Sequence, residues 1–435
     1  MTALRTSDLA RQRGMGIVEV MVGILIGMIV IVVVYNILSV AEGYKRVTIG
    51  NSDAQITGLM TQFVAGRDAG NGGAGVTMSA GSNTVPEDLA LCTRDETGAL
   101  ISGLAITALD AAVRPVPVLI TNGVSPLSDS FIALNTGASH VMWPVDFTSP
   151  SAAGAAITVQ SPNGFTVPAP TGAAPYWVVT MANDPAGPNV GRCKVLTVTA
   201  ASVPDAQGRV TLTQGAPATS IAYSVAGPAR LLNLGPQGLA TRIQYDVDNV
   251  NAVLRTTDLL VVPPNPFVVN PIAQNIVLMK VQYGIDTTVL PVTLNGDGTV
   301  DCWTPAVAGS VCGGDYSAGS VRNFTLAQLN RILAVRIGVV VRSDEPDLKL
   351  LTDPTNLQLQ DEAKPLLSAT RPPVVLFNCS TNNAACQSRV VVTMGGTPTG
   401  SPTCLPNVIC DYWRYRTYET VIPLRNAIFA ATMPP

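Results

Sequence analysis

Eight cysteines are the residues of this 435-residue chain whose spacing predicts chemistry most directly. No two of them are spaced as C-x-x-C, which disfavours zinc ribbons and thioredoxin-like redox sites. Close pairs in a chain this poor in charge favour disulfides that form in an oxidising compartment, with free buried cysteines as the alternative. The disulfide candidates are three close pairs and two more distant residues: Cys302 and Cys312, Cys379 and Cys386, Cys404 and Cys410, then Cys92 and Cys193.

A second group of residues suited to chemistry lies in the segment NGDGTVD, residues 295–301. Asn295, Asp297 and Asp301 offer oxygen donors of the kind that calcium prefers, on a loop that two glycines make flexible. The distal glutamate of an EF-hand is missing at the required spacing. Because Asn-Gly and Asp-Gly are also the favoured dipeptides of hairpin turns, we favour a turn, with a calcium site as the alternative.

The remaining candidates for catalysis have simpler interpretations. The chain holds a single histidine, His140, which excludes a multi-histidine metal centre. No G-x-S-x-G motif accompanies it, so we interpret His140 as a structural residue. The run Gly70–Gly75 fits G-x-G-x-x-G, but it follows a predicted helix, whereas a dinucleotide site follows a strand. We therefore interpret the run as a linker and expect neither an enzyme nor an organic cofactor.

The composition disfavours further classes of protein. Charged residues make up 13% of the chain, against roughly 25% in an average soluble protein. The net charge of −3 gives no support for nucleic-acid binding. Hydrophobic residues reach 47%, which is ample for a core. The 38 glycines and 33 prolines follow no G-X-Y period, so the chain is not collagen-like.

The N-terminal segment carries the most specific pattern. Residues 1–14 include three arginines, and Val20 to Ala41 contains no charged residue. That run fits the roughly 20 residues that cross a bilayer as a helix. Glu19 lies inside the apolar stretch, where a carboxylate is costly and usually marks pairing or function. Cleavage after Gly14 would create an amine on Met15, a cation close enough along the chain to pair with Glu19.

The string RQRGMGIVEVMVGILIGMIV, residues 11–30, resembles the class III signal of type IV prepilins and type II secretion pseudopilins. The resemblance implies that residues 1–14 are a leader peptide and that a prepilin peptidase cleaves between Gly14 and Met15. It also implies methylation of the new N-terminus and a role in assembly for Glu19. Met15 departs from the phenylalanine that the family usually has at this position.

The apolar pattern predicts that the helix continues beyond the membrane. Apolar residues recur at spacings that place them on one face of a helix: Ile49, Ile56, Leu59, Met60, Phe63 and Val64. We expect a spine helix over residues 15–65, transmembrane at about 20–41, with this apolar face against a head domain. A glycine-rich linker over residues 66–85 is expected to follow it.

The fold class predicted for the whole chain is α+β. It consists of a long pilin-like helix, transmembrane in its first half, packed on a large β-rich, disulfide-containing head over residues 86–435. Short β-branched runs between turn residues predict strands at 195–200, 209–213, 241–247, 252–262, 275–285, 334–343, 374–378, 389–394 and 415–424. Thr325 and Gln328 predict one short capped helix. Residues 95–235 form either a separate, variable lobe or a set of long loops, and the sequence leaves both open.

Landmarks within residues 240–435 resemble, in order, those of PilW-type minor pilins. They are KVQYGID (280–286), NGDGTVD (295–301), RILAVRIGVVVRS (331–343) and YRTYETVIPLRN (415–426). The resemblance implies a pilin-core-like region here and a structural rather than catalytic role. An aromatic and basic cluster suits an interface or a core equally: Tyr412, Trp413, Arg414, Tyr415, Arg416 and Tyr418.

The function implied by the resemblance is that of a minor pilin that primes assembly of a type IV pilus at its tip. The implied partners are other minor and major pilins, the prepilin peptidase, the inner-membrane assembly platform and a large tip adhesin, with no nucleic acid. The protein would first cross the inner membrane once, with its head in the periplasm, and then join the pilus on the cell surface. A large pseudopilin of a type II secretion system and a membrane-anchored surface adhesin are the two alternatives.

Overall fold

The structure of the protein is a computed structural model, and all structural statements below concern the residues that it describes. These are 16–73, 116–123, 127–135, 145–148, 154–162, 164–166, 175–182, 193–215, 229–239, 241–260, 267–288, 297–321, 324, 326–344, 374–377, 390–392 and 415–424. The chain divides into two compact units, Met1–Asp53 and Ala54–Pro435. Each unit is described by itself.

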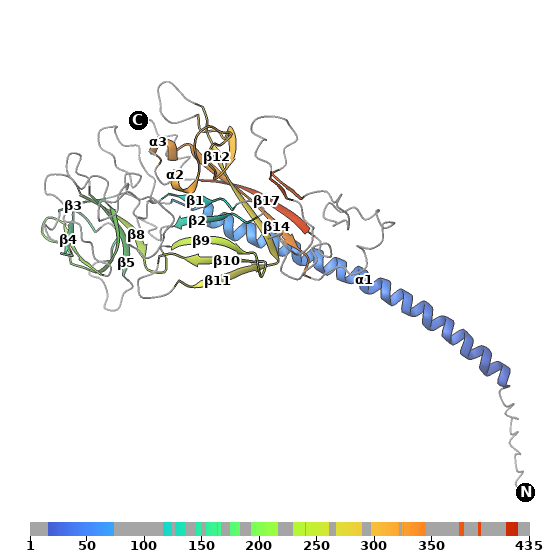
Figure 1. Cartoon of the computed structure of the whole chain (residues 1–435). Coiled ribbons are helices and arrows are strands. Elements are labelled where there is room, and N and C mark those ends of the chain that lie inside the picture. The colour runs from blue at the N-terminus through green and yellow to red at the C-terminus, as the bar shows by residue number, and fades with distance from the viewer. Residues whose placement is uncertain are drawn as a thin grey trace, which may run out of the picture. The chain divides into compact units, whose positions relative to one another are not determined.

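The first element is the long helix α1, Ile17–Gly70 (Figure 1). Among the described residues it is the one helix that is long and apolar enough to cross a membrane. The predicted continuous helix is therefore confirmed. It ends at Gly70 rather than at Ala65, because Asp68 and Ala69 are buried against the head and hold one more turn in place.

The head contains a five-stranded antiparallel sheet in the order β1-β2-β9-β10-β11. Its strands are β1 Val118–Thr121, β2 Ser130–Asn135, β9 Thr241–Asp248, β10 Val253–Asp258 and β11 Val269–Gln274. The last three strands follow one another in the chain and lie side by side in Figure 1. Strands that are consecutive in the chain are usually neighbours in a sheet, which accounts for this part of the order.

A second sheet has four antiparallel strands in the order β13-β12-β14-β17. Its strands are β12 Ile276–Ile285, β13 Cys302–Pro305, β14 Ile332–Arg342 and β17 Tyr415–Pro423. β12 and β14 are buried along nearly their whole length, as expected of central strands covered on both faces. The head also contains smaller elements: α2 Ala318–Val321, α3 Leu326–Leu329, and the pair β15 Val374–Leu376 and β16 Val390–Val392.

Between β2 and β9 the chain forms a closed six-stranded barrel in the order β3-β4-β7-β6-β5-β8. Its strands are β3 Val145–Thr148, β4 Ile157–Val159, β5 Tyr176–Ala182, β6 Cys193–Ala201, β7 Val210–Gln214 and β8 Ala229–Pro236. β8 pairs with β3 and closes the cylinder. The described part of residues 95–235 thus holds a folded barrel, one of the two arrangements that the sequence left open.

Every strand predicted from the sequence is present, with ends that differ by a few residues, and α3 is the predicted short helix. The mixture of one long helix with mainly antiparallel sheet agrees with the predicted α+β class. The sequence did not predict β1 to β5, β8, β11 or β13. Most of these are short or contain few β-branched residues.

Candidate functional site

The first turns of α1 contain the residue that the sequence singles out for assembly. Glu19 lies in the first turn, where its backbone N–H donates a 2.9 Å hydrogen bond to the carbonyl of Gly16. Its side chain is exposed, as are the apolar side chains that follow it along the helix. A carboxylate at a helix N-terminus is favoured by the helix dipole. The predicted cleavage residues Gly14 and Met15 lie outside the described residues.

From Ala54 onward, α1 packs on the head with a face of small residues. The buried positions recur every three or four residues, at Ala54, Gly58, Thr61, Ala65 and Ala69. Small side chains let the helix backbone lie against β17, since a Cβ at Gly58 would overlap the ring of Tyr418. At Gly70 an added Cβ would lie 3.2 Å from Cγ2 of Ile422.

The large apolar residues of the same helical segment point elsewhere, so their predicted contact with the head is wrong. Ile56, Leu59, Met60 and Phe63 are 62%, 53%, 51% and 71% exposed. Val64 alone of the predicted face packs partly against the core. The reason is steric: β17 already presents bulky side chains to the helix, and only small residues fit against them. We call these four exposed residues the apolar face of α1.

The end of α1 is fixed to the five-stranded sheet by a buried hydrogen bond. The hydroxyl of Tyr245 in β9 donates to Oδ2 of Asp68 at 2.6 Å. The Tyr245 ring stacks on Phe131 with centroids 4.7 Å apart. Burial raises the pKa of Tyr245 above its ordinary value, and the neighbouring Asp68 carboxylate raises it further. Nε of Arg67 donates to Oδ1 of the same carboxylate at 2.8 Å.

The run Gly70–Gly75 contributes to packing in its described part. An added Cβ on Gly72 would lie 2.6 Å from the carbonyl oxygen of Pro117, so only glycine allows this close approach. Gly73 has a φ of 76°, a left-handed conformation that favours glycine. Its N–H donates a 2.9 Å hydrogen bond to the carbonyl of Leu134 in β2. The described part of the predicted linker, residues 66–73, is therefore the end of the helix and a packed turn rather than a flexible segment, and residues 74–85 lie outside the described residues.

The predicted oxygen-donor loop places its carboxylates beside a third one, which precedes the loop in the sequence. Asp286, Asp297 and Asp301 each place an oxygen within 4.8 Å of the others. Two of these residues are predicted calcium ligands, and Asn295 lies outside the described residues. Asp286, at the end of β12, was missed because it precedes the loop by several residues.

Each of the three carboxylates accepts hydrogen bonds from groups of the same loop. The N–H of Gly298 donates to Asp286 at 2.7 Å, and the N–H of Thr287 donates to Asp301 at 3.0 Å. Asp297 accepts hydrogen bonds from the hydroxyl and the N–H of Thr299, which lower its pKa. These contacts are of the kind that a tight turn makes, and the same three carboxylates are the oxygen donors of the calcium alternative.

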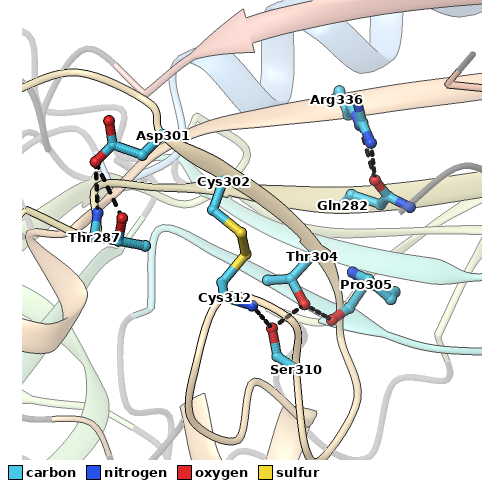
Figure 2. The surroundings of a disulfide bond; sticks show 9 residues. All are labelled: Gln282, Thr287, Asp301, Cys302, Thr304, Pro305, Ser310, Cys312 and Arg336. Atoms are coloured by element: carbon cyan, nitrogen blue, oxygen red, sulfur yellow. Dashed lines mark hydrogen bonds between the residues drawn. A yellow bond between two sulfur atoms is a disulfide. The ribbon is translucent and has the colours of Figure 1, made fainter. Parts of the chain in front are cut away.

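The disulfide between Cys302 and Cys312 is present, with Cα atoms 5.7 Å apart (Figure 2). Ser310 supports the closed loop, because its hydroxyl donates to Oγ1 of Thr304 at 2.6 Å and accepts from the N–H of Cys312 at 3.0 Å. The predicted pairing of these two cysteines is therefore confirmed. The other candidates fall outside the described side chains: Cys92, Cys193, Cys379, Cys386, Cys404 and Cys410.

A buried arginine that the sequence analysis did not single out lies on the face of the four-stranded sheet. Arg336 in β14 donates to the side-chain oxygen of Gln282, its partner in β12 (Figure 2). The guanidinium lies 4.8 Å from the ring centroid of Trp303 and 4.4 Å from that of Phe377. Burial lowers the pKa of Arg336 to about 10, and the charge of Glu419 opposes that shift.

Part of the predicted aromatic cluster belongs to the protein interior. Tyr415 belongs to the buried cluster that includes Leu376 of β15. Tyr418 packs against α1 at Gly58. For these two tyrosines the core interpretation holds. Tyr412, Trp413 and Arg414 lie outside the described residues, as does His140.

Comparison with known proteins relates the C-terminal part of the chain to one family. Residues 244–426 match the model of the family described as type IV pilus-assembly protein W. The match runs from within β9 to just beyond β17 and connects this part of the chain with the assembly of type IV pili. The search of curated proteins found no match, and neither did the search of solved structures.

Proposed function

We propose that this protein is a minor pilin of a type IV pilus, which helps to start pilus assembly and is located at or near the tip. One observation carries the proposal: α1 continues from an apolar, membrane-length segment into a head-bound segment with an exposed apolar face. The family match with a type IV pilus-assembly protein supports it.

The apolar face of α1 requires a partner outside the head. Contiguous exposed apolar surface on a folded protein marks an interaction site. The face lies on the same helix, C-terminal to the membrane-length segment, and it consists of side chains that a helix presents together. In an assembled pilus, the helices of neighbouring pilins would cover both the membrane-length segment and this face.

Glu19 would set the axial position of each helix in that bundle. In the proposed processing, the prepilin peptidase cleaves between Gly14 and Met15, and the new N-terminus is methylated. Glu19 then pairs with an N-terminal amine, its own or that of a neighbour. An unpaired carboxylate is costly in a low-dielectric bundle. Pairing therefore favours one register among apolar helices that otherwise slide freely.

The remaining parts of the proposal follow from this role. The protein crosses the inner membrane once, with its head in the periplasm, before it enters the pilus. Its partners are other minor and major pilins, the prepilin peptidase and the inner-membrane assembly platform, and it helps to display a large tip adhesin. We expect no catalytic activity and no nucleic-acid binding.

Mass spectrometry of the intact N-terminus tests the proposal. The protein is isolated from cell envelopes with and without the prepilin peptidase. We expect a methylated Met15 terminus that depends on the peptidase. An intact Met1 or a cut elsewhere would contradict pilin processing and favour the surface-adhesin alternative.

Deletion of the gene separates the two pilin-like alternatives. A minor pilin predicts loss of surface pili with normal secretion of exported enzymes. A pseudopilin of a type II secretion system predicts the reverse.

A further inference from the structure

The barrel leaves and rejoins the five-stranded sheet at a single point. Asn135, the last residue of β2, is the register partner of Thr241, the first residue of β9. Directly opposed residues of an antiparallel pair lie roughly 5 Å apart at their Cα atoms. Residues 136–240 are therefore an insertion at the end of a β2–β9 hairpin, and a two-residue turn could bridge the same gap.

The barrel has a hydrophobic core of its own. Side chains from its strands and from Phe165 form one buried cluster, separate from the core that α1 shares with the two sheets. The members of this cluster are Phe147, Ile157, Val159, Phe165, Val178, Leu196, Val198, Ala201, Val210, Leu212 and Leu231. A domain with its own core can in principle fold alone.

The strands of the barrel pair with one another in the part of the chain that the structure describes, and two ion pairs join residues within it. Each of the six strands pairs with two others of the barrel, so closure leaves no free strand edge to join the sheets. Arg230 pairs with Asp146 at 3.1 Å, and Arg209 pairs with Asp205 at 2.7 Å.

The family match supplies an independent observation. It begins at residue 244, three residues after the insertion rejoins β9, and it continues to residue 426. The stretch related to a pilus-assembly protein therefore contains the four-stranded sheet, β10, β11 and most of β9. It leaves out the barrel, as it leaves out everything before residue 244, including α1, β1 and β2.

We infer that the barrel is an autonomous domain that pilus assembly does not require. Assembly then depends on α1 and the two sheets, and the barrel is an addition to that machinery. The part of this inference that concerns assembly rests on the proposed function; the autonomy of the barrel does not.

The first test replaces residues 136–240 with Asn-Gly, which joins Asn135 to Thr241 through a hairpin turn. We expect the shortened protein to accumulate in envelopes and to restore surface pili to a gene-deletion strain within about twofold of the wild-type number. A protein that fails to accumulate, or that accumulates without restoring pili, overturns the inference. A deletion strain with normal pili would instead contradict the proposed function.

A second test keeps the chain at full length. Leu196→Asp places a charge in the barrel core, and Ile337→Asp places one in the core of the sheets; both positions are fully buried. Calorimetry of the purified full-length protein should show two unfolding transitions. Leu196→Asp should remove one transition and leave pilus number unchanged, whereas Ile337→Asp should abolish pili. Unfolding in one common transition, or loss of pili with Leu196→Asp, overturns the inference whether or not the proposed function holds.

Discussion

The hydroxyl of Tyr245 donates a 2.6 Å hydrogen bond to the carboxylate of Asp68, which joins the last turn of α1 to the middle strand of the five-stranded sheet. The two side chains are 1% and 4% exposed as whole residues, so neither group can exchange this partner for water. The contact fixes the position of the last turn of α1, along the helix axis, relative to β9. It also explains why the helix continues past Ala65.

Tyr245→Phe should destabilise the head by about 1.5–3 kcal/mol, because it removes a buried hydrogen bond to a charged group. The measurement is equilibrium unfolding of the purified protein in urea. Tyr44→Phe is the matched control, since Tyr44 is 64% exposed on the same helix and should leave the unfolding midpoint unchanged. Equal midpoints for the two variants would show that the hydrogen bond does not anchor α1.

The same tyrosine predicts a dependence of stability on alkaline pH. Burial raises the pKa of Tyr245 in the folded state above the ordinary value of 10.0. The unfolded chain therefore loses this proton at a lower pH than the folded chain does. Stability should be intact below pH 10 and fall as the pH rises above it, by up to about 1.4 kcal/mol per pH unit for this group.

Tyr245→Phe should reduce that slope in urea titrations between pH 9 and 11. Tyr316 and Tyr418 have pKa values raised by burial as well, so part of the decline should remain in the variant. An unchanged slope would mean that Tyr245 ionises equally well in both states.

The contrast between the two faces of α1 shows where prediction from the sequence succeeds and fails. Long β-branched runs between turn residues mark strands such as β12 and β14, because hydrophobic content and turn chemistry agree there. A face made of Gly58, Thr61 and Ala65 gives no such signal, since small residues hardly change the hydropathy pattern. The large residues beside them dominate the pattern and led to assignment of the wrong face.

The site and the insertion illustrate a second limit. Asp286 joins Asp297 and Asp301 only through the pairing of β12 with its neighbours, so the local motif could not include it. The barrel could not be predicted from the sequence either. Some of its strands are very short, such as β4 at three residues. Its closure depends on contacts between segments that are distant in the chain.

The acidic loop should fold without calcium, because Asp297 and Asp301 accept hydrogen bonds from Thr299 and Thr287 of the same loop, which hold the turn without a metal. We expect no calcium-dependent heat in isothermal titration of the purified protein, and the same melting temperature in calcium and in chelator. A bound ligand at 100 times its Kd would add about 2.7 kcal/mol to stability, which both methods detect. A rise in melting temperature with calcium that Asp301→Asn removes would establish the metal site instead.

Glu19→Ala should insert into the membrane and be cleaved normally but assemble poorly. Insertion into the membrane depends on the apolar helix, which the variant retains. The register of the helix bundle, by contrast, depends on the carboxylate. The measurement is the amount of mature protein in envelopes and in sheared pili. Normal recovery of the variant in pili, with normal pilus number, would contradict the pairing argument.

The two faces of α1 can be separated by paired substitutions. Phe63→Ser changes a residue that is 71% exposed, so it should leave the unfolding midpoint of the purified protein unchanged and reduce pilus number several-fold. Gly58→Val drives a branched side chain into the ring of Tyr418 and should destabilise the head by about 1–3 kcal/mol. Electron microscopy of pili and urea unfolding together distinguish the effects. If Phe63→Ser lowered stability and left pili intact, the exposed face would serve the fold rather than assembly.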